Sequence, residues 1–144
     1  MKLPTKCRYG LRAVLEIART YGSGPAKRKD IAASQELSDS YLENILIVLK
    51  NNHVIDTTRG VNGGYVLSRH PKEITMLDIV CALDGPPEIV ECVSKASSCK
   101  RSSTCVSRTV WQELSAAWHK ILVSTTLQDL LDREITNEAP SYSI

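Results

Sequence analysis

Three of the five cysteines of this chain lie within fourteen residues of one another, in the segment ECVSKASSCKRSSTC. They are Cys92, Cys99 and Cys105, and most of the residues between them are serines and basic side chains. A segment with so little apolar content cannot form a core of its own. A polar loop that carries three thiols therefore indicates a metal-binding or redox site rather than a structural element.

Three thiolates leave three interpretations of this loop. Soft thiolates bind both zinc and iron–sulfur clusters, and an incomplete fourth position suits an iron–sulfur centre that must be labile. Zinc is the competing metal, but the spacing differs from the paired Cys-x-x-Cys of common zinc modules. Without metal, two of the thiols could form a disulfide on oxidation, since Lys95, Lys100 and Arg101 favour the thiolate form.

The remaining cysteines, Cys7 and Cys81, stand outside this loop. Cys81 has apolar neighbours and is interpreted as a small buried hydrophobic residue. An odd number of cysteines cannot pair completely, and no secretory signal is evident, so we expect reduced thiols and a cytoplasmic location. No stretch approaches the roughly 20 apolar residues of a membrane span, so no membrane partner is expected.

The elements that must position these groups follow from apolar periodicity. Apolar side chains at helical spacing predict three helices, over residues 5–21, 27–34 and 40–51. The next segment, HVIDTTRGVNGGYVLS, predicts two short strands around a glycine-rich turn. Three helices followed by a hairpin are the order of a winged helix-turn-helix, which we place in residues 1–72.

The second half predicts a connection, the cysteine loop and a dimerising arm. A helix in the segment KEITMLDIVCALDG falls in a connecting region, residues 73–90, and the cysteine loop occupies 91–106. The apolar stripe of the next helix, Val106–Val123, needs a partner, which the same helix of a second chain would supply. Residues 106–136 are therefore expected to form the dimerisation helix and a short C-terminal helix, followed by a flexible tail, 137–144.

Charge is unevenly distributed between the two halves. Residues 1–72 carry twelve Lys and Arg against six Asp and Glu, whereas residues 73–144 carry six against ten. A basic half that contains a helix-turn-helix points to double-stranded DNA as the partner. No phosphate-binding glycine loop, Ser/His/Asp grouping or metalloprotease motif is present, so neither enzymatic activity nor a small-molecule substrate is expected.

The second helix of a helix-turn-helix places its N-terminal residues at base edges in the major groove. Serine can bond a base or a phosphate, glutamate accepts from cytosine, and asparagine suits adenine. Either Ser38 or Ser40 can also cap this helix, and Glu43 would complete a capping box with Ser40.

Basic residues complete the predicted surface. Lys and Arg at the start of the preceding helix can neutralise phosphates, and an Arg at a wing tip can enter the minor groove over A·T-rich sequence. The candidate DNA-binding residues are Lys27, Arg28, Ser38, Ser40, Tyr41, Glu43, Asn44, Arg59 and Gly60.

The segments KCRYGLRAVLEIA, LSDSYLENIL and RGVNGGYVLSRHP resemble the iron–sulfur transcription factors of the IscR, NsrR and RirA group, the Rrf2 family. The cysteine triad and the order of parts match as well, and the resemblance covers essentially residues 1–133. It implies a homodimeric regulator of a pseudo-palindromic DNA site, controlled by an iron–sulfur cluster that senses iron, redox state or nitric oxide. It places DNA contacts at Ser40, Tyr41, Glu43 and Arg59.

The resemblance also implies the ligands of the cluster, which would be held by the three loop cysteines and by a fourth, non-cysteine ligand. A 2Fe–2S cluster is favoured over a 4Fe–4S cluster. IscR-like members have a histidine where this chain has Arg108, and NsrR-like members an acidic residue where it has Arg8. Arginine is not a plausible ligand at either place, so the fourth ligand is open. Cys7 of the partner chain is one candidate, beside an ordinary half-buried thiol role for this residue.

We therefore expect a mainly α-helical protein with a small β-hairpin wing, that is, a winged helix-turn-helix plus a long dimerisation helix. One alternative is a cluster-free DNA-binding regulator that uses a cysteine thiol switch or zinc. The other is a small iron–sulfur electron-transfer or cluster-carrier protein, against which the basic half and the winged domain argue.

Overall fold

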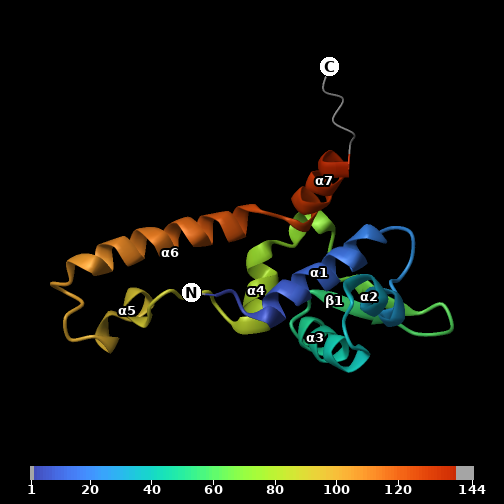
Figure 1. Ribbon diagram of the computed structural model, residues 1–144, viewed down its shortest axis with the longest axis horizontal. Helices are drawn as coiled ribbons and strands as arrows, with labels where there is room; N and C mark the ends of the chain where they lie inside the picture. Colours follow the sequence, from blue (N-terminus) through green and yellow to red (C-terminus); the bar gives the residue numbers. More distant parts are fainter. Residues whose placement is uncertain (1, 139–144) are drawn as a thin grey trace, which may run out of the picture.

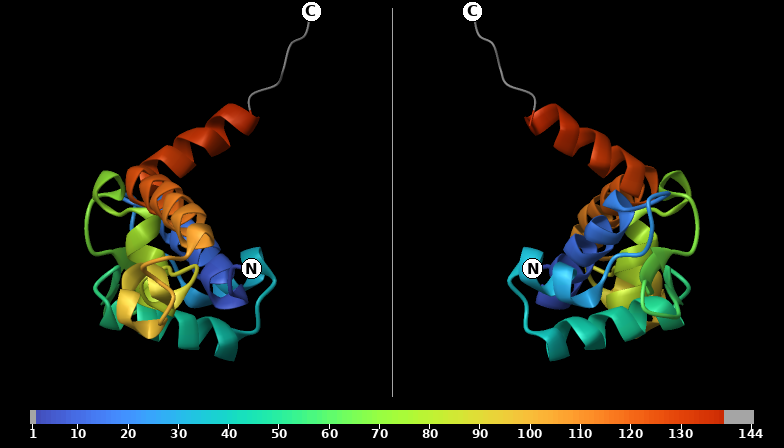
Figure 2. Two further views of the ribbon diagram at one scale, coloured as in Figure 1. Left: turned by 90° about the vertical axis from the view of Figure 1, so that its left-hand side faces the viewer. Right: turned by 90° about the vertical axis from the view of Figure 1, so that its right-hand side faces the viewer.

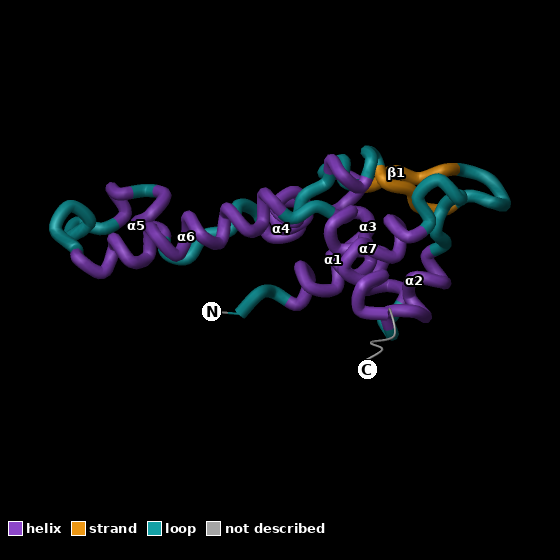
Figure 3. The backbone as a smooth tube through the Cα atoms, turned by 90° about the horizontal axis from the view of Figure 1, so that it is seen from above, coloured by secondary structure: helices purple, strands orange, loops and turns teal. Residues whose placement is uncertain are grey.

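A computed structural model describes residues 2–138 of the chain. A winged domain lies at one end of the long axis, and an arm carries the cysteine loop to the other end (Figures 1 and 3). The helices are α1 (Thr5–Arg19), α2 (Arg28–Gln35), α3 (Asp39–Asn51), α4 (Met76–Asp84), α5 (Glu91–Ser94), α6 (Val106–Ser124) and α7 (Leu127–Glu138). The remaining elements are the strands β1 (Ile55–Thr58) and β2 (Gly64–Leu67) and the 3-10 turns η1 (Pro71–Glu73) and η2 (Ala96–Ser98). The predicted fold class is confirmed.

Helix α1 is the centre of the winged domain. It lies between α3 on one side and α7 on the other (Figure 2), and it also packs on α4. Gly10 permits the close approach to α4, because a Cβ atom there would lie 2.2 Å from Leu83 Cδ1. The buried face of α1 consists of Cys7, Gly10, Ala13, Val14, Ile17 and Ala18.

The hairpin forms the predicted wing. Strands β1 and β2 are antiparallel, in a register that runs from Ile55 opposite Leu67 to Thr58 opposite Gly64. Ile55 and Leu67 are buried, whereas the other three residues of β1 are exposed. The base of the wing therefore belongs to the core, and its tip projects into solvent.

The segment before α4 differs from the sequence prediction. Instead of one helix, it forms the turn η1, an extended residue Ile74, and α4 from Met76 onward. Thr75 is the N-cap of α4 and fixes the first residue of this helix. Its side chain accepts a hydrogen bond from the N–H of Asp78, while the Asp78 carboxylate accepts one from the Thr75 N–H. The backbone carbonyl of Ile74 lies outside α4 and accepts a 2.9 Å hydrogen bond from the N–H of Leu127, which docks the start of α7.

Helix α7 extends further than the sequence suggested. It runs to Glu138 and is joined to α1 by an ion pair of 2.5 Å between Arg19 and Glu134. The predicted flexible tail was to begin at residue 137, which is helical; its remaining residues, 139–144, lie outside the described residues.

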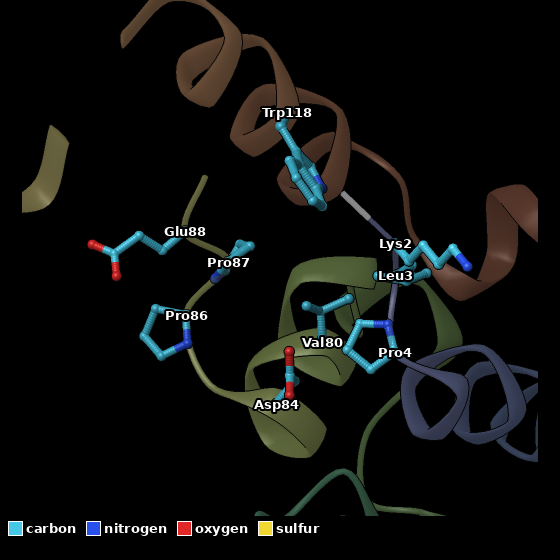
Figure 4. A pocket seen from close by; sticks show the side chains of 9 residues that line it. All are labelled: Lys2, Leu3, Pro4, Val80, Asp84, Pro86, Pro87, Glu88 and Trp118. Carbon is cyan, nitrogen blue, oxygen red and sulfur yellow. The ribbon is translucent and has the colours of Figure 1, made fainter. Parts of the chain in front are cut away.

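Helix α6 leaves the domain as the arm. At its base, Trp118 faces Pro4 and Val80 across a cavity of about 320 Å³ (Figure 4). Leu122 is its one buried residue, so most of the helix is covered by no other part of residues 2–138. None of the described helices combines the length and hydropathy needed to cross a membrane.

Candidate DNA-binding surface and cysteine loop

The turn between α2 and α3 determines where α3 begins, which is the second helix, or recognition helix, of the helix-turn-helix. Glu36 takes a left-handed conformation (φ 54°) and ends α2. Ser38 then caps α3, because its side-chain oxygen accepts a 3.3 Å hydrogen bond from the backbone N–H of Tyr41. Of the two predicted caps, Ser38 is the one formed. The capping box expected between Ser40 and Glu43 is wrong, because Ser40 already lies inside the helix.

Helix α3 presents polar side chains to solvent at its N-terminal end. Ser40, Glu43 and Asn44 are exposed, opposite a face that is buried in the core. Tyr41 is half-buried and packs edge-to-face on Tyr9 of α1, with the ring centroids 6.1 Å apart. The residues expected to read bases are therefore accessible, whereas Tyr41 also holds α3 against α1.

Arg28 and Glu43, which were each predicted to contact DNA, form an ion pair with each other. Arg28 Nε lies 2.9 Å from a carboxylate oxygen of Asp39, and its Nη1 lies 3.0 Å from one of Glu43. Such solvent-exposed ion pairs are weak and are screened by salt. A phosphate that binds Arg28, or a base that binds Glu43, must therefore displace this pairing.

The wing is fixed to the start of the helix-turn-helix. Tyr65 of β2 exchanges two backbone hydrogen bonds of 2.8 Å with Ala26, and exposed Lys27 follows directly before α2. Arg59 and Gly60 lie in the exposed turn of the hairpin, where Gly60 has a φ of 107°. An exposed arginine thus lies in the turn of an anchored hairpin, and the phosphate-binding candidate Lys27 follows the residue that pairs with β2.

The three loop cysteines lie on short elements that face solvent. Cys92 in α5 and Cys105 before α6 are half-buried, Cys99 after η2 is exposed, and all three thiols are free. Within residues 2–138, no three His, Cys, Asp or Glu side chains are grouped closely enough to hold a metal ion. The donor atoms suit an iron–sulfur group, and holding one requires the loop to bring its thiols together.

Cys105 stands where hydrogen bonds can stabilise its ionised form. It stands at the N-cap of α6, and its Sγ lies 3.2 Å from Ser107 Oγ. The hydrogen bond from Ser107, followed by the backbone N–H of Arg108, lowers the pKa of Cys105. By contrast, burial raises the pKa of both Cys7 and Cys81.

The structure shows the surroundings of Arg108, which stands where IscR-like members have a histidine, and of Cys7, the named candidate for the fourth ligand. Arg108 is half-buried, and its Nε–H donates a 2.8 Å hydrogen bond to the backbone carbonyl of Cys92. Sequence reasoning missed this contact, because no local pattern predicts a bond between residues sixteen apart. Cys7 is 2% exposed within the core of its own chain, which favours its role as a packing residue.

A helix-turn-helix with an exposed polar recognition face, followed by an anchored β-hairpin, defines a winged-helix DNA-binding protein. Within this class, the chain belongs to the Rrf2 family: the family model described as "Iron-dependent Transcriptional regulator" matches residues 3–133. The protein is therefore a transcriptional regulator and not an enzyme.

The relatives bear different names within this family. The chain is 39% identical to "Protein rrf2" of Nitratidesulfovibrio vulgaris, over 91% of this chain and 87% of the relative. The solved structure of CymR, the "Global Cysteine Regulator" of B. subtilis, has a TM-score of 0.77 at 36% identity, covering 92% of this chain and 98% of that one. The solved structure of T. potens IscR has a TM-score of 0.79 at 33% identity, covering 99% and 95%.

The lowered pKa of Cys105 predicts selective reactivity in the protein without bound metal. Because the thiolate is the nucleophile, Cys105 is expected to stay reactive toward iodoacetamide to lower pH than Cys81. Ser107→Ala removes the largest stabilising contribution and is expected to move the reactivity midpoint of Cys105 upward. Mass-spectrometric mapping of alkylation rates against pH measures both effects.

The matched control is Ser103→Ala, which changes another exposed serine of the loop. A midpoint for Cys105 that is the same in wild type and Ser107→Ala would contradict this account of the thiol.

Proposed function

We propose that the chain is a homodimeric regulator of pseudo-palindromic DNA, with an affinity set by an iron–sulfur cluster on Cys92, Cys99 and Cys105. The strongest support is the position of the cysteine loop, which leads directly into α6, the helix with the uncovered apolar side. When bound, the cluster would supply a group sensitive to iron, redox state or nitric oxide, and a 2Fe–2S cluster is favoured over 4Fe–4S. Ordering of the loop would then act on the helix that joins two protomers.

The apolar side of α6 supports the homodimer. Val110, Leu114 and Ile121 are 55%, 40% and 62% exposed, and their spacing puts them along one face of the helix. The same helix of a second copy, related by a two-fold axis, would cover this stripe. Two recognition helices would then face successive major grooves, about 34 Å apart.

The exposed residues of the winged domain would make three kinds of contact with DNA. The start of α3 would read base edges, the residues around the start of α2 would neutralise phosphates, and the wing tip would enter the minor groove. As a DNA-binding regulator, the protein would act in the cytoplasm. The proposed contacts are Ser38, Ser40, Tyr41, Glu43 and Asn44 on α3, Lys27 and Arg28 at α2, and Arg59 and Gly60 in the wing.

A second candidate is a regulator without a cluster, which senses oxidants through the loop thiols or holds zinc there. The lowered pKa of Cys105 favours a thiol switch. Its thiolate would attack a sulfenic acid formed on a second loop cysteine by a peroxide, giving a disulfide and releasing hydroxide. The loop would be ordered by a sulfur–sulfur bond instead of a cluster.

The dimer predicts the effect of a charge on α6. Leu114→Asp would bury a carboxylate in the proposed interface, so this variant is expected to be monomeric by size-exclusion chromatography with light scattering. The control Val61→Asp changes a wing residue that is 95% exposed, and it is expected to remain dimeric. A wild-type protein that is itself monomeric at micromolar concentration would contradict the prediction.

The wing predicts a distinct loss of DNA binding. On a duplex obtained by in vitro selection with the wild type, Arg59→Gln is expected to bind about tenfold more weakly, with a salt slope shallower by about one. Fluorescence anisotropy at several salt concentrations measures both quantities. Arg133→Gln, on α7, removes the same charge far from the proposed surface and is expected to bind as wild type does. Equal losses in both variants would count against a specific role for Arg59.

The cluster predicts a visible spectrum. Protein purified anaerobically is expected to show a charge-transfer band with matching iron and sulfide, all lost in Cys92→Ala and retained in Cys81→Ala. A spectrum without such a band, with no sulfide even after reconstitution, would reject the cluster and leave the second candidate.

A further inference from the structure

The cysteine loop contains a helix that has little of its own to hold it. Helix α5 has four residues, none of which is buried, and no side chain caps its N-terminus at Val90. Isolated helices shorter than about 12 residues are marginal in water. The position of α5, and of Cys92 within it, must therefore be fixed by contacts from outside the helix.

The packing between α5 and α6 supplies only part of this support. The two helices lie side by side at the far end of the arm (Figures 1 and 3). A cavity of about 330 Å³ lies beside this junction, lined by Pro86, Pro87 and Glu88 of the connecting segment, Val93 and Ser94 of α5, and Ser115 of α6. Side-chain packing around α5 is therefore incomplete, so hydrogen bonds must contribute to holding this helix in position.

Arg108 makes the directional contact across the junction. From the first turn of α6, its Nε–H donates to the carbonyl oxygen of Cys92 over 2.8 Å. It is the one hydrogen bond between α5 and α6 in the part of the chain that the structure describes. Because Arg108 is half-buried and charged, the bond is partly shielded from water and stronger than one between neutral groups.

We propose that Arg108 is a positioning residue that fastens the cysteine loop to α6. The backbone at Cys92 and the first turn of α6 would then move as one body. A change in the loop would reach the dimerisation helix through this hydrogen bond. The role of Arg108 in signalling rests on the proposed function, whereas its hydrogen bond to Cys92 belongs to the chain without any cofactor. Arginine suits this role, because its planar group stays protonated and donates in a fixed direction.

Hydrogen exchange in the full chain, prepared without metal, tests the proposal. The amides to follow are those of Val93 and Lys95, which donate to the carbonyls of Val90 and Glu91. Arg108→Gln is expected to raise their exchange rates roughly tenfold, as loss of a charge-assisted hydrogen bond allows α5 to open more often. Alkylation of Cys92 is expected to accelerate by a similar factor.

Arg101→Gln is the matched control, because it removes an exposed positive charge from the same loop but no bond to Cys92. Its exchange rates are expected to equal those of wild type. Unchanged rates in Arg108→Gln, or equal increases in both variants, would overturn the proposal.

Arg108→Lys keeps the charge without the Nε–H donor, and it also serves if Arg108→Gln does not fold by circular dichroism. It is expected to raise the rates as Arg108→Gln does; wild-type rates in this variant would overturn the assignment to the Nε–H bond. Since no cluster is present in these measurements, their result is separate from that of the spectrum, and either hypothesis can fail alone.

Discussion

The structure depends on a helix that one protomer cannot cover. Among the nineteen residues of α6, only Leu122 is buried, so the apolar stripe of this helix remains in water. Fully burying a Val or Leu side chain contributes about 1.5–3 kcal/mol, so covering the stripe with a second copy would stabilise both chains. Because the cysteine loop and the winged domain stand at the two ends of the same helix (Figure 1), this pairing would also determine how a change in the loop reaches the winged domain.

Distance constrains that communication. The cysteine loop and the wing lie at opposite ends of the long axis (Figures 1 and 3), so no direct contact between them exists within one protomer. In the proposed function, a change in the loop would reach α3 along α6, through the segment that joins α5 to α4, or through the second protomer. At the receiving end, the ion pairs of Arg28 with Asp39 and Glu43 are exposed and weak, so small changes in geometry can alter which groups face DNA.

Local signals were enough to predict most of the fold. Apolar spacing located α1, α3 and α6, and the glycines of the turn located the wing. Boundaries set by side-chain capping were harder, because Ser38 and Ser40 are equivalent in sequence and only the path of the turn selects Ser38. Contacts between distant segments could not be predicted at all: α5 has no periodicity, and the bond from Arg108 to Cys92 exists only once α5 and α6 are side by side.

In the proposed function, the state of the cysteine loop sets the affinity for DNA. The most direct test of this dependence is anaerobic fluorescence anisotropy on one selected duplex, with the same preparation measured before and after its cluster is removed by chelation. We expect a change in affinity of about tenfold or more, equivalent to at least ~1.4 kcal/mol of coupling between loop and DNA, and no response to the same treatment in Cys92→Ala. Equal affinities of the cluster-loaded and cluster-free protein would contradict the proposed function.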